Sequence, residues 1–128
     1  MTKEKISHEY NLRTTISLTH MWQYFHTEDG LGTWFADKVI SKNGIYEFFW
    51  ENTSQKAKIL HKTQQFSVRF HWIDDEEETT YFQFKLERDD ITNVVTLTIT
   101  DFSYPDERED TIQLWNTQLE KLRRTVGL

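Results

Sequence analysis

Five histidines are the side chains of this sequence best suited to bind a metal ion or to move protons: His8, His20, His26, His61 and His71. Metal sites built from histidine show short regular spacings such as H-E-x-x-H, or a carboxylate at ligand spacing. Neither pattern occurs, and the absence of cysteine excludes a Cys-ligated zinc or iron–sulfur site. The glycines fit no phosphate-cradling motif. We therefore predict neither a metal nor a cofactor.

A hydroxyl–imidazole group, formed by Ser41 and Tyr46 with His61, is the second candidate chemistry. A Ser–His nucleophile needs a third group that orients the histidine, and a glycine-rich oxyanion loop. The sequence offers neither at a suitable spacing, so no catalytic residue is assigned. The same side chains in an aromatic pocket would suit a small-molecule site. Buried polar groups are usually satisfied by their neighbours, so ordinary core packing is the preferred interpretation.

The length and composition of the chain predict one globular domain, residues 1–128. Charged residues make up 28% and aromatic residues 15% of the chain, which is typical of a folded protein with a bulky core. The formal net charge of −6 repels phosphate backbones, so nucleic acid is not an expected partner. Acidic residues gather at 74–78 and 106–110, and we interpret these runs as a solvated loop and a helix start.

Hydropathy gives no sign of a membrane protein. The first twenty residues contain no apolar core of a signal peptide, and no apolar run approaches the length of a membrane span. A cytoplasmic location is the default prediction.

The N-terminal part predicts one strand and two short helices. Apolar and polar residues alternate from residue 6 to 12, as in a half-buried strand whose inner face carries Ile6, His8, Tyr10 and Leu12. After Ser17, a candidate N-cap, the apolar spacing becomes helical. Two glycines interrupt that spacing, so residues 28–35 are predicted to form a second short helix or a turn.

The segment from Asp37 to the Tyr104-Pro105 break predicts an antiparallel meander of six strands. Asn43-Gly44 is the strongest hairpin signal, because both central residues of a type I′ turn need positive φ. Matching apolar residues across each hairpin gives the following pairs: Ser41 with Tyr46, Val39 with Phe48, Tyr46 with His61, Phe48 with Ile59, Trp50 with Ala57, His61 with Val68, Ile59 with Phe70, Phe70 with Phe82, Val68 with Phe84, Phe84 with Leu97, and Phe82 with Ile99. These registers place the apolar residues on one face, with His61 towards the core and His71 towards solvent.

The C-terminal segment predicts the helix that covers this face. Asp106 is expected to cap it, with Glu109 in the capping-box position. Acidic residues at its start and basic residues at its end suit the helix dipole. One apolar stripe runs down the helix, made of Ile112, Trp115, Leu119, Leu122 and Val126.

Five segments occur in a distinctive order: GLGTWFAD (30–37), FFW (48–50), SVRFHW (67–72), TLTITDF (96–102) and LWNTQLEKLR (114–123). Together with the predicted elements, this order resembles the helix-grip fold of the START-like superfamily, which includes Bet v 1-type proteins and polyketide cyclases. It is most similar to the branch related to the C-terminal domain of the Hsp90 ATPase activator. The resemblance covers essentially the whole chain. It implies an α+β fold in which a curved antiparallel sheet, one N-terminal strand plus the meander, carries two short helices and a long C-terminal helix across its concave face.

In that family the space between the sheet and the last helix can hold an apolar ligand, and Trp34 and Phe35 would close one end of it. The candidate lining residues are Trp22, Trp34, Phe35, Ser41, Tyr46, Phe48, Trp50, His61, Phe70, Trp72, Phe82, Trp115 and Leu119. An open cavity and a space filled by aromatic side chains are both compatible with this composition.

Three functions remain open at this point. The leading prediction is non-catalytic binding of a small apolar or amphipathic molecule between the sheet and the C-terminal helix. A protein-interaction module is the alternative, as the resemblance to a co-chaperone implies. A cyclase-like enzyme that uses His61 and Tyr46 as acid and base is the third. We expect a monomer or a weak homodimer.

Overall fold

Residues 2–12 and 16–127 are described by the computed structural model of the chain. The elements follow in the order β1 (Glu4–Leu12), α1 (Leu18–His26), α2 (Glu28–Trp34), β2 (Lys38–Lys42), β3 (Ile45–Trp50), β4 (Thr53–Thr63), β5 (Ser67–Trp72), β6 (Phe82–Arg88), β7 (Val95–Ser103), one 3-10 turn η1 (Pro105–Glu107) and α3 (Arg108–Val126).

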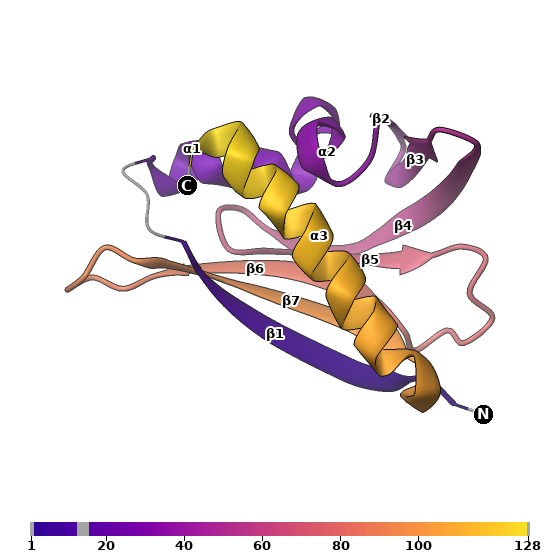
Figure 1. Cartoon of the computed structure of the whole chain (residues 1–128). Helices are drawn as coiled ribbons and strands as arrows, with labels where there is room; N and C mark the ends of the chain where they lie inside the picture. Colours follow the sequence, from indigo (N-terminus) through magenta and orange to yellow (C-terminus); the bar gives the residue numbers. More distant parts are fainter. Residues whose placement is uncertain (1, 13–15, 128) are drawn as a thin grey trace.

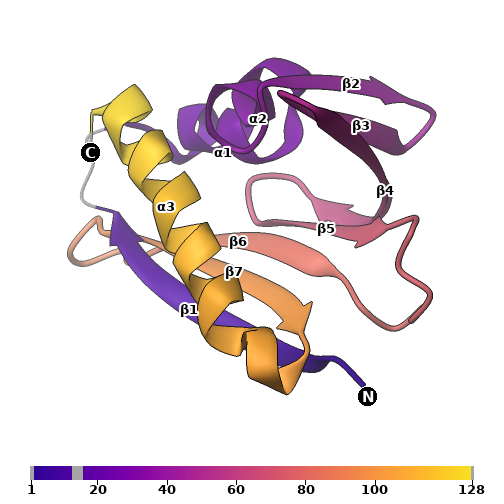
Figure 2. The same ribbon diagram turned by 45° about the vertical axis from the view of Figure 1, so that its right-hand side comes forward.

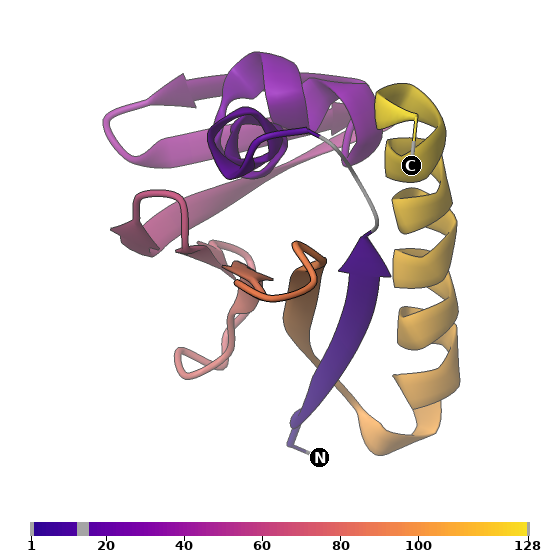
Figure 3. The ribbon, with the colours of Figure 1, turned by 90° about the vertical axis from the view of Figure 1, so that its left-hand side faces the viewer.

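The strands form one antiparallel sheet in the order β1-β7-β6-β5-β4-β3-β2, with β1 and β2 at its edges. The sheet is curved, and α3 crosses its concave side, while α1 and α2 lie at the end next to β2 and β3 (Figures 1 and 2). Figure 3 shows α3 along one side of the sheet and the α1–α2 pair across its end. The predicted α+β helix-grip fold is confirmed.

Two of the predicted hairpin registers are confirmed. In the first hairpin Ser41 pairs with Tyr46, around Asn43 and Gly44, which both have positive φ. In the β5–β6 hairpin Val68 pairs with Phe84, so the inner face of the sheet carries the aromatic residues as expected. The acidic run between these strands is therefore a hairpin loop.

The predicted β3–β4 and β6–β7 registers are wrong, and each is shifted by an even number of residues. Tyr46 pairs with Ala57 rather than with His61, because the chain turns at residues 51–52 instead of using a longer loop. Phe84 pairs with Ile99 rather than with Leu97. A slip of two or four residues leaves every side chain on its predicted face, so matching of apolar residues could not detect it.

The predicted pairing of His61 with Val68 is wrong for a different reason. Ile59 pairs with Phe70 as predicted, but an irregularity follows, and His61 then pairs with Arg69. A β-bulge inserts one extra residue and changes the face of those beyond it. His61 consequently lies on the outer face and is exposed, not directed towards the core.

Helix ends are set by short polar contacts. The Ser17 hydroxyl accepts a hydrogen bond from the His20 N–H at 3.1 Å, so the predicted N-cap of α1 is confirmed. The predicted Asp106 capping box is wrong. The Pro105–Glu107 turn precedes α3 instead, and Glu107, without a side-chain cap bond, stands at its N-cap. Pro105 has a fixed φ suited to a first helical turn, which explains why a 3-10 turn begins there and α3 begins only at Arg108.

One apolar core fills the molecule between the sheet and the three helices. α3 contributes Trp115, Leu119 and Leu122 as buried residues, whereas the two outer members of its predicted stripe are only partly buried. The buried aromatic residues of β3, β5 and β6 line the space between the sheet and the helices. This space is where the family resemblance places a ligand.

Candidate functional site

The corner between α1 and α2 positions the Trp34-Phe35 pair. Thr27 serves both helices: its hydroxyl donates to the Gln23 carbonyl at 2.7 Å and accepts from the Gly30 N–H at 2.9 Å. A Cβ on Gly30 would lie 1.9 Å from the Gln23 carbonyl oxygen, so only glycine permits this close approach. The tight corner directs the end of α2 into the core.

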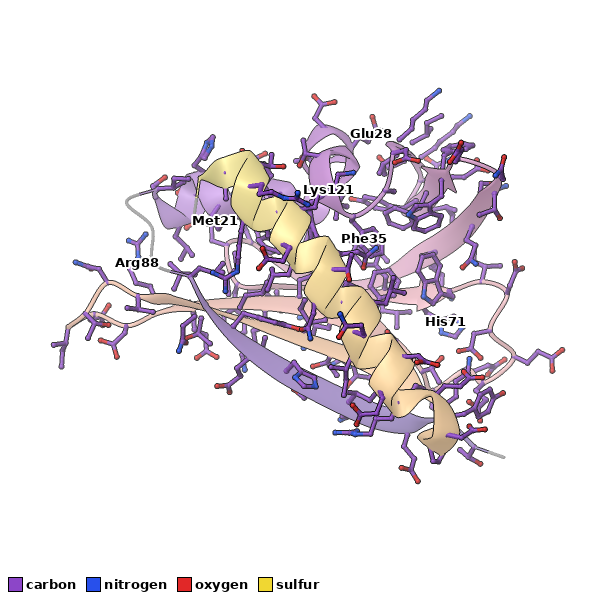
Figure 4. All side chains as sticks on the ribbon, viewed as in Figure 1. Met21, Glu28, Phe35, His71, Arg88 and Lys121 are labelled. Atoms are coloured by element: carbon purple, nitrogen blue, oxygen red, sulfur yellow. The ribbon has the colours of Figure 1, made fainter. Side chains whose placement is uncertain are left out.

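Phe35 lies at the centre of the space between the sheet and α3, which we call the grip. Its ring stacks between Phe82 of the sheet and Trp115 of α3, with ring centroids 5.6 Å away on each side. It also meets the Phe48 ring edge-on at 4.9 Å and is only 3% exposed. Figure 4 shows Phe35 beside the middle of α3. The space between sheet and helix is filled here by a side chain of the protein itself.

The backbone of Phe35 joins three elements. Its carbonyl accepts a hydrogen bond from the Trp50 indole N–H of β3 at 3.1 Å and another from the Gln118 amide of α3 at 3.2 Å. Trp34 is fixed beside it, because its indole N–H donates to the Tyr24 carbonyl at 2.7 Å. Phe35 is therefore held by its main chain as well as by ring stacking.

The structure places most of the predicted lining residues in this core, where they contact one another. The buried ones are Trp22, Trp34, Phe35, Tyr46, Phe48, Phe70, Phe82, Trp115 and Leu119, and the half-buried ones are Trp50 and Trp72. Ser41 is half-buried but is not part of this core. His61 is outside the core.

Ser41, Tyr46 and His61 line one surface groove of about 420 Å³ at the end of the β2–β3 hairpin, although not through the predicted pairing. Each is engaged elsewhere. The Ser41 hydroxyl donates to Glu28, the Tyr46 hydroxyl donates to the His26 carbonyl at 2.8 Å, and the His61 ring contacts the Thr63 hydroxyl. Burial raises the pKa of Tyr46, which opposes its use as a base.

A second groove, of about 210 Å³, lies at the mouth of the grip between the end of α2 and α3. We call it the mouth groove. Its lining includes Phe35, Trp50 and Asp37, together with Lys121 and Arg124 of α3. Both cations are exposed, and neither has an ion-pair partner among the residues described.

Asp101 is a buried group that the sequence-based candidates missed. It lies on β7 under α3, where the Trp115 indole N–H donates to its Oδ2 at 2.8 Å and the Phe102 N–H to its Oδ1 at 2.7 Å. Burial raises the pKa of Asp101 to about 6, and these hydrogen bonds only partly oppose that effect. The alternation of Leu97 and Ile99 with threonines was the available signal, because it places Asp101 on the inner face.

The positions of the remaining titratable groups decide whether the described part of the chain could bind a metal ion. No group of three or more His, Asp or Glu side chains that could hold a metal ion occurs within residues 2–12 and 16–127. Over the same residues, no helix is long and apolar enough to cross a membrane.

A curved sheet that grips a C-terminal helix over a packed aromatic interior defines the class of this protein as a helix-grip α+β domain. The chain belongs to the START-like superfamily, because the family model for a START-like superfamily domain matches residues 1–128.

Solved structures give the same result. A Bacteroides fragilis protein is 42% identical, with 98% of this chain and 92% of that chain covered and a TM-score of 0.70. The Aha1 dimer from Colwellia psychrerythraea is 17% identical, with 96% of each chain covered and a TM-score of 0.78. A Bacillus halodurans protein is 16% identical, with 98% and 99% covered and a TM-score of 0.71. The last two show similarity of fold alone. No curated protein sequence matches the chain.

Proposed function

We propose that this single START-like domain is a non-catalytic protein-interaction module rather than a carrier of a molecule inside the grip. Phe35 carries the proposal, since its ring occupies the space between Phe82 and Trp115 at 5.6 Å from each. Small-molecule sites usually enclose about 300–1,000 Å³ and bury most of their ligand. With that space filled, the surface is the place left for recognition.

The comparisons support this function only at the level of fold. The Aha1 dimer from Colwellia psychrerythraea shares the fold, and the sequence resembles the branch related to the Hsp90 ATPase activator. By this analogy the chain acts in the cytoplasm on a protein partner, as a monomer or a weak homodimer.

A substitution inside the grip separates the two classes of function. Phe35→Leu removes the stacked ring but keeps an apolar side chain and the carbonyl that Trp50 and Gln118 bind. An interaction module should keep its affinity for a purified partner within about twofold, because interior changes do not alter surface contacts. A carrier should instead change its content of bound molecule. Native mass spectrometry of wild type and Phe35→Leu, with calorimetric titration of the purified partner, makes the comparison. A small molecule that co-purifies with wild type and is altered by the substitution would refute the proposal.

The mouth groove supports a second candidate function, closer to the leading sequence-based prediction. Its aromatic lining and its two cations, Lys121 and Arg124, suit a small amphipathic anion such as an aromatic carboxylate. Naphthoate titrated by NMR should then shift the amides around Phe35 and Gln118. Lys121→Gln with Arg124→Gln should weaken this binding by about tenfold, whereas Lys42→Gln at the far hairpin should not.

A further inference from the structure

The outer face of the sheet carries an unusual apolar surface at β4 and β5. Outer faces of antiparallel sheets are normally polar. Leu60 and Ile73 are nevertheless 44% and 47% exposed. They belong to a groove of about 590 Å³, which we call the convex groove; its lining residues are Lys58, Leu60, His71, Ile73, Asp75, Glu76 and Glu78. Asp75, Glu76 and Glu78 belong to the loop that joins β5 to β6, and this loop extends away from α3 (Figure 2).

Alternation along β4 places Leu60 on this surface, at the position of the β-bulge. Lys58 and Ile59 pair regularly with β5, and pairing resumes at His61, which leaves Leu60 as the extra residue. Lys58 lies on the outer face, so alternation places Leu60 there as well, and the bulge turns His61 outward after it. Leu60 therefore lies with Lys58 and His71 along the outer face.

The acidic wall of the convex groove is held in a fixed conformation. Asp75 accepts hydrogen bonds from the Thr80 hydroxyl at 2.6 Å, the Glu77 N–H at 3.0 Å and the Lys3 ammonium at 3.0 Å. The His71 ring bonds the Thr80 carbonyl at 2.8 Å, which ties the loop to β5. A preformed wall loses little conformational entropy when it binds a partner.

Two carboxylates of this wall remain available. Glu76 and Glu78 are exposed, and neither forms an ion pair with any described residue. Asp75 is neutralised by Lys3, and Lys58 is the cation that lines the groove. The whole chain carries a net charge of −6. An apolar floor beside free carboxylates is complementary to apolar side chains flanked by cations.

We propose that the convex groove binds a segment of a partner protein that presents apolar side chains next to lysine or arginine. This inference rests on the proposed interaction function and names the surface and the partner chemistry. Leu60 and Ile73 receive the apolar side chains, and Glu76 and Glu78 pair with the cations. The groove admits only a few side chains, so a single segment binds weakly and with dependence on salt.

A short peptide of alternating lysine and leucine is the probe. It is titrated into the full chain and followed by amide NMR, beside two comparison peptides in which glutamate replaces lysine or serine replaces leucine. The lysine–leucine peptide should shift the amides of residues 58–60 and 71–78, and its dissociation constant should rise with added salt. The two comparison peptides should bind at least about tenfold more weakly.

Two pairs of variants, each with a matched control, test the residues. Leu60→Ser with Ile73→Ser should weaken the peptide by about tenfold, while Ile40→Ser, a residue 44% exposed on β2, should not. Glu76→Gln with Glu78→Gln should weaken it about threefold and remove the salt dependence, while Glu9→Gln with Asp90→Asn should not. The second pair lies on an exposed loop, so it keeps the test valid if the first pair alters folding.

Several results would overturn the inference. Peptide shifts centred outside the convex groove would do so, as would equal losses in variants and controls. Concentration-dependent sedimentation abolished by Leu60→Ser with Ile73→Ser would identify a second copy of the chain as the occupant instead. A small molecule found in the grip would refute the proposed function but would leave the peptide shifts in place, so the two failures are distinguishable.

Discussion

Asp101 has an environment that is unusual for an aspartate. It lies under α3 among apolar residues, with the Trp115 and Phe102 N–H groups as its donors. Because burial raises its pKa from 3.8 to about 6, the folded state prefers its protonated form. Its contribution to stability is therefore fully present below the unfolded pKa and is lost as pH rises through the folded pKa.

We predict that Asp101→Asn removes this pH dependence. A pKa raised from 3.8 to about 6 corresponds to about 2–3 kcal/mol of stability lost between pH 4 and pH 8. The difference in unfolding free energy between those two pH values should shrink by about that amount in the variant, as measured by urea denaturation. Asp90→Asn, in an exposed loop, should keep the wild-type slope. An unchanged slope in Asp101→Asn would show that the carboxyl titrates normally.

Trp115 provides a complementary test from the helix side. Trp115→Phe keeps an aromatic ring near Phe35 but removes the N–H that donates to Asp101 at 2.8 Å. Loss of a donor to the charged form should raise the pKa of Asp101 above about 6. Stability should fall by about 1–3 kcal/mol at pH 8 and by less at pH 4. A carboxyl carbon NMR titration measures the pKa, with Trp72→Phe as the control.

Burial of the large aromatic residues was predictable from the alternation of apolar positions. The environment of Asp101 was not predicted, and the predicted direction of the His61 side chain was wrong. Asp101 followed the same alternation and could have been placed on the inner face. His61 could not, since the bulge that turns it outward depends on how two strands pair rather than on the local sequence. Side-chain direction is thus predictable only while the strand stays regular.

At the scale of elements, strands and helices were predictable and their registers were less so. Local turn chemistry fixed the hairpin at Asn43-Gly44, where positive φ demands particular residues. The β3–β4 turn at residues 51–52 has no Asn-Gly pair and no positive φ, so apolar matching decided the prediction and gave a slip of four. Such matching constrains only the face of each strand.

The β5–β6 loop shows that a run of acidic residues can contain both structural and solvated members. Asp75 is held by three donors and its side chain is only 10% exposed, whereas Glu76 is exposed. Burial alone would raise the pKa of Asp75, but the hydrogen bonds from Thr80 and Lys3 outweigh it and lower that pKa. The sequence-based interpretation as a solvated loop therefore fits only part of the run.

We predict that Asp75→Asn destabilises the protein by about 1–3 kcal/mol, because its three donors then share a single acceptor oxygen. Glu76→Gln should change stability by less than about 0.5 kcal/mol. Chemical denaturation at pH 7 measures both. Since the pKa of Asp75 is lowered, the difference between Asp75→Asn and wild type should narrow as pH falls through that pKa. Equal effects of the two substitutions would mean that the loop is not ordered by Asp75.

For the molecule as a whole, the fold could be predicted but the state of its interior could not. Element order and the family resemblance were sufficient for a helix-grip domain. Whether the grip is open or filled depends on the path of the α1–α2 corner, where Gly30 lets α2 approach α1 and so places Phe35 inside. A close approach between two helices depends on tertiary packing, so it cannot be predicted from a local sequence pattern.

The filled grip should make the helices and the sheet unfold together. Phe35 stacks on β6 and α3 and bonds β3 and α3 through its carbonyl, so no helix can leave without exposing the same aromatic cluster. Phe35→Ala should cost about 3–5 kcal/mol. Amide exchange of the most protected residues in α3 and in β6 should then accelerate by the same factor, about a hundredfold or more. Phe66→Ala, at a turn where the ring is 42% exposed, is the control and should change neither. If α3 lost protection while β6 kept it, the helix would be a separate unit, and the grip would be able to open without global unfolding.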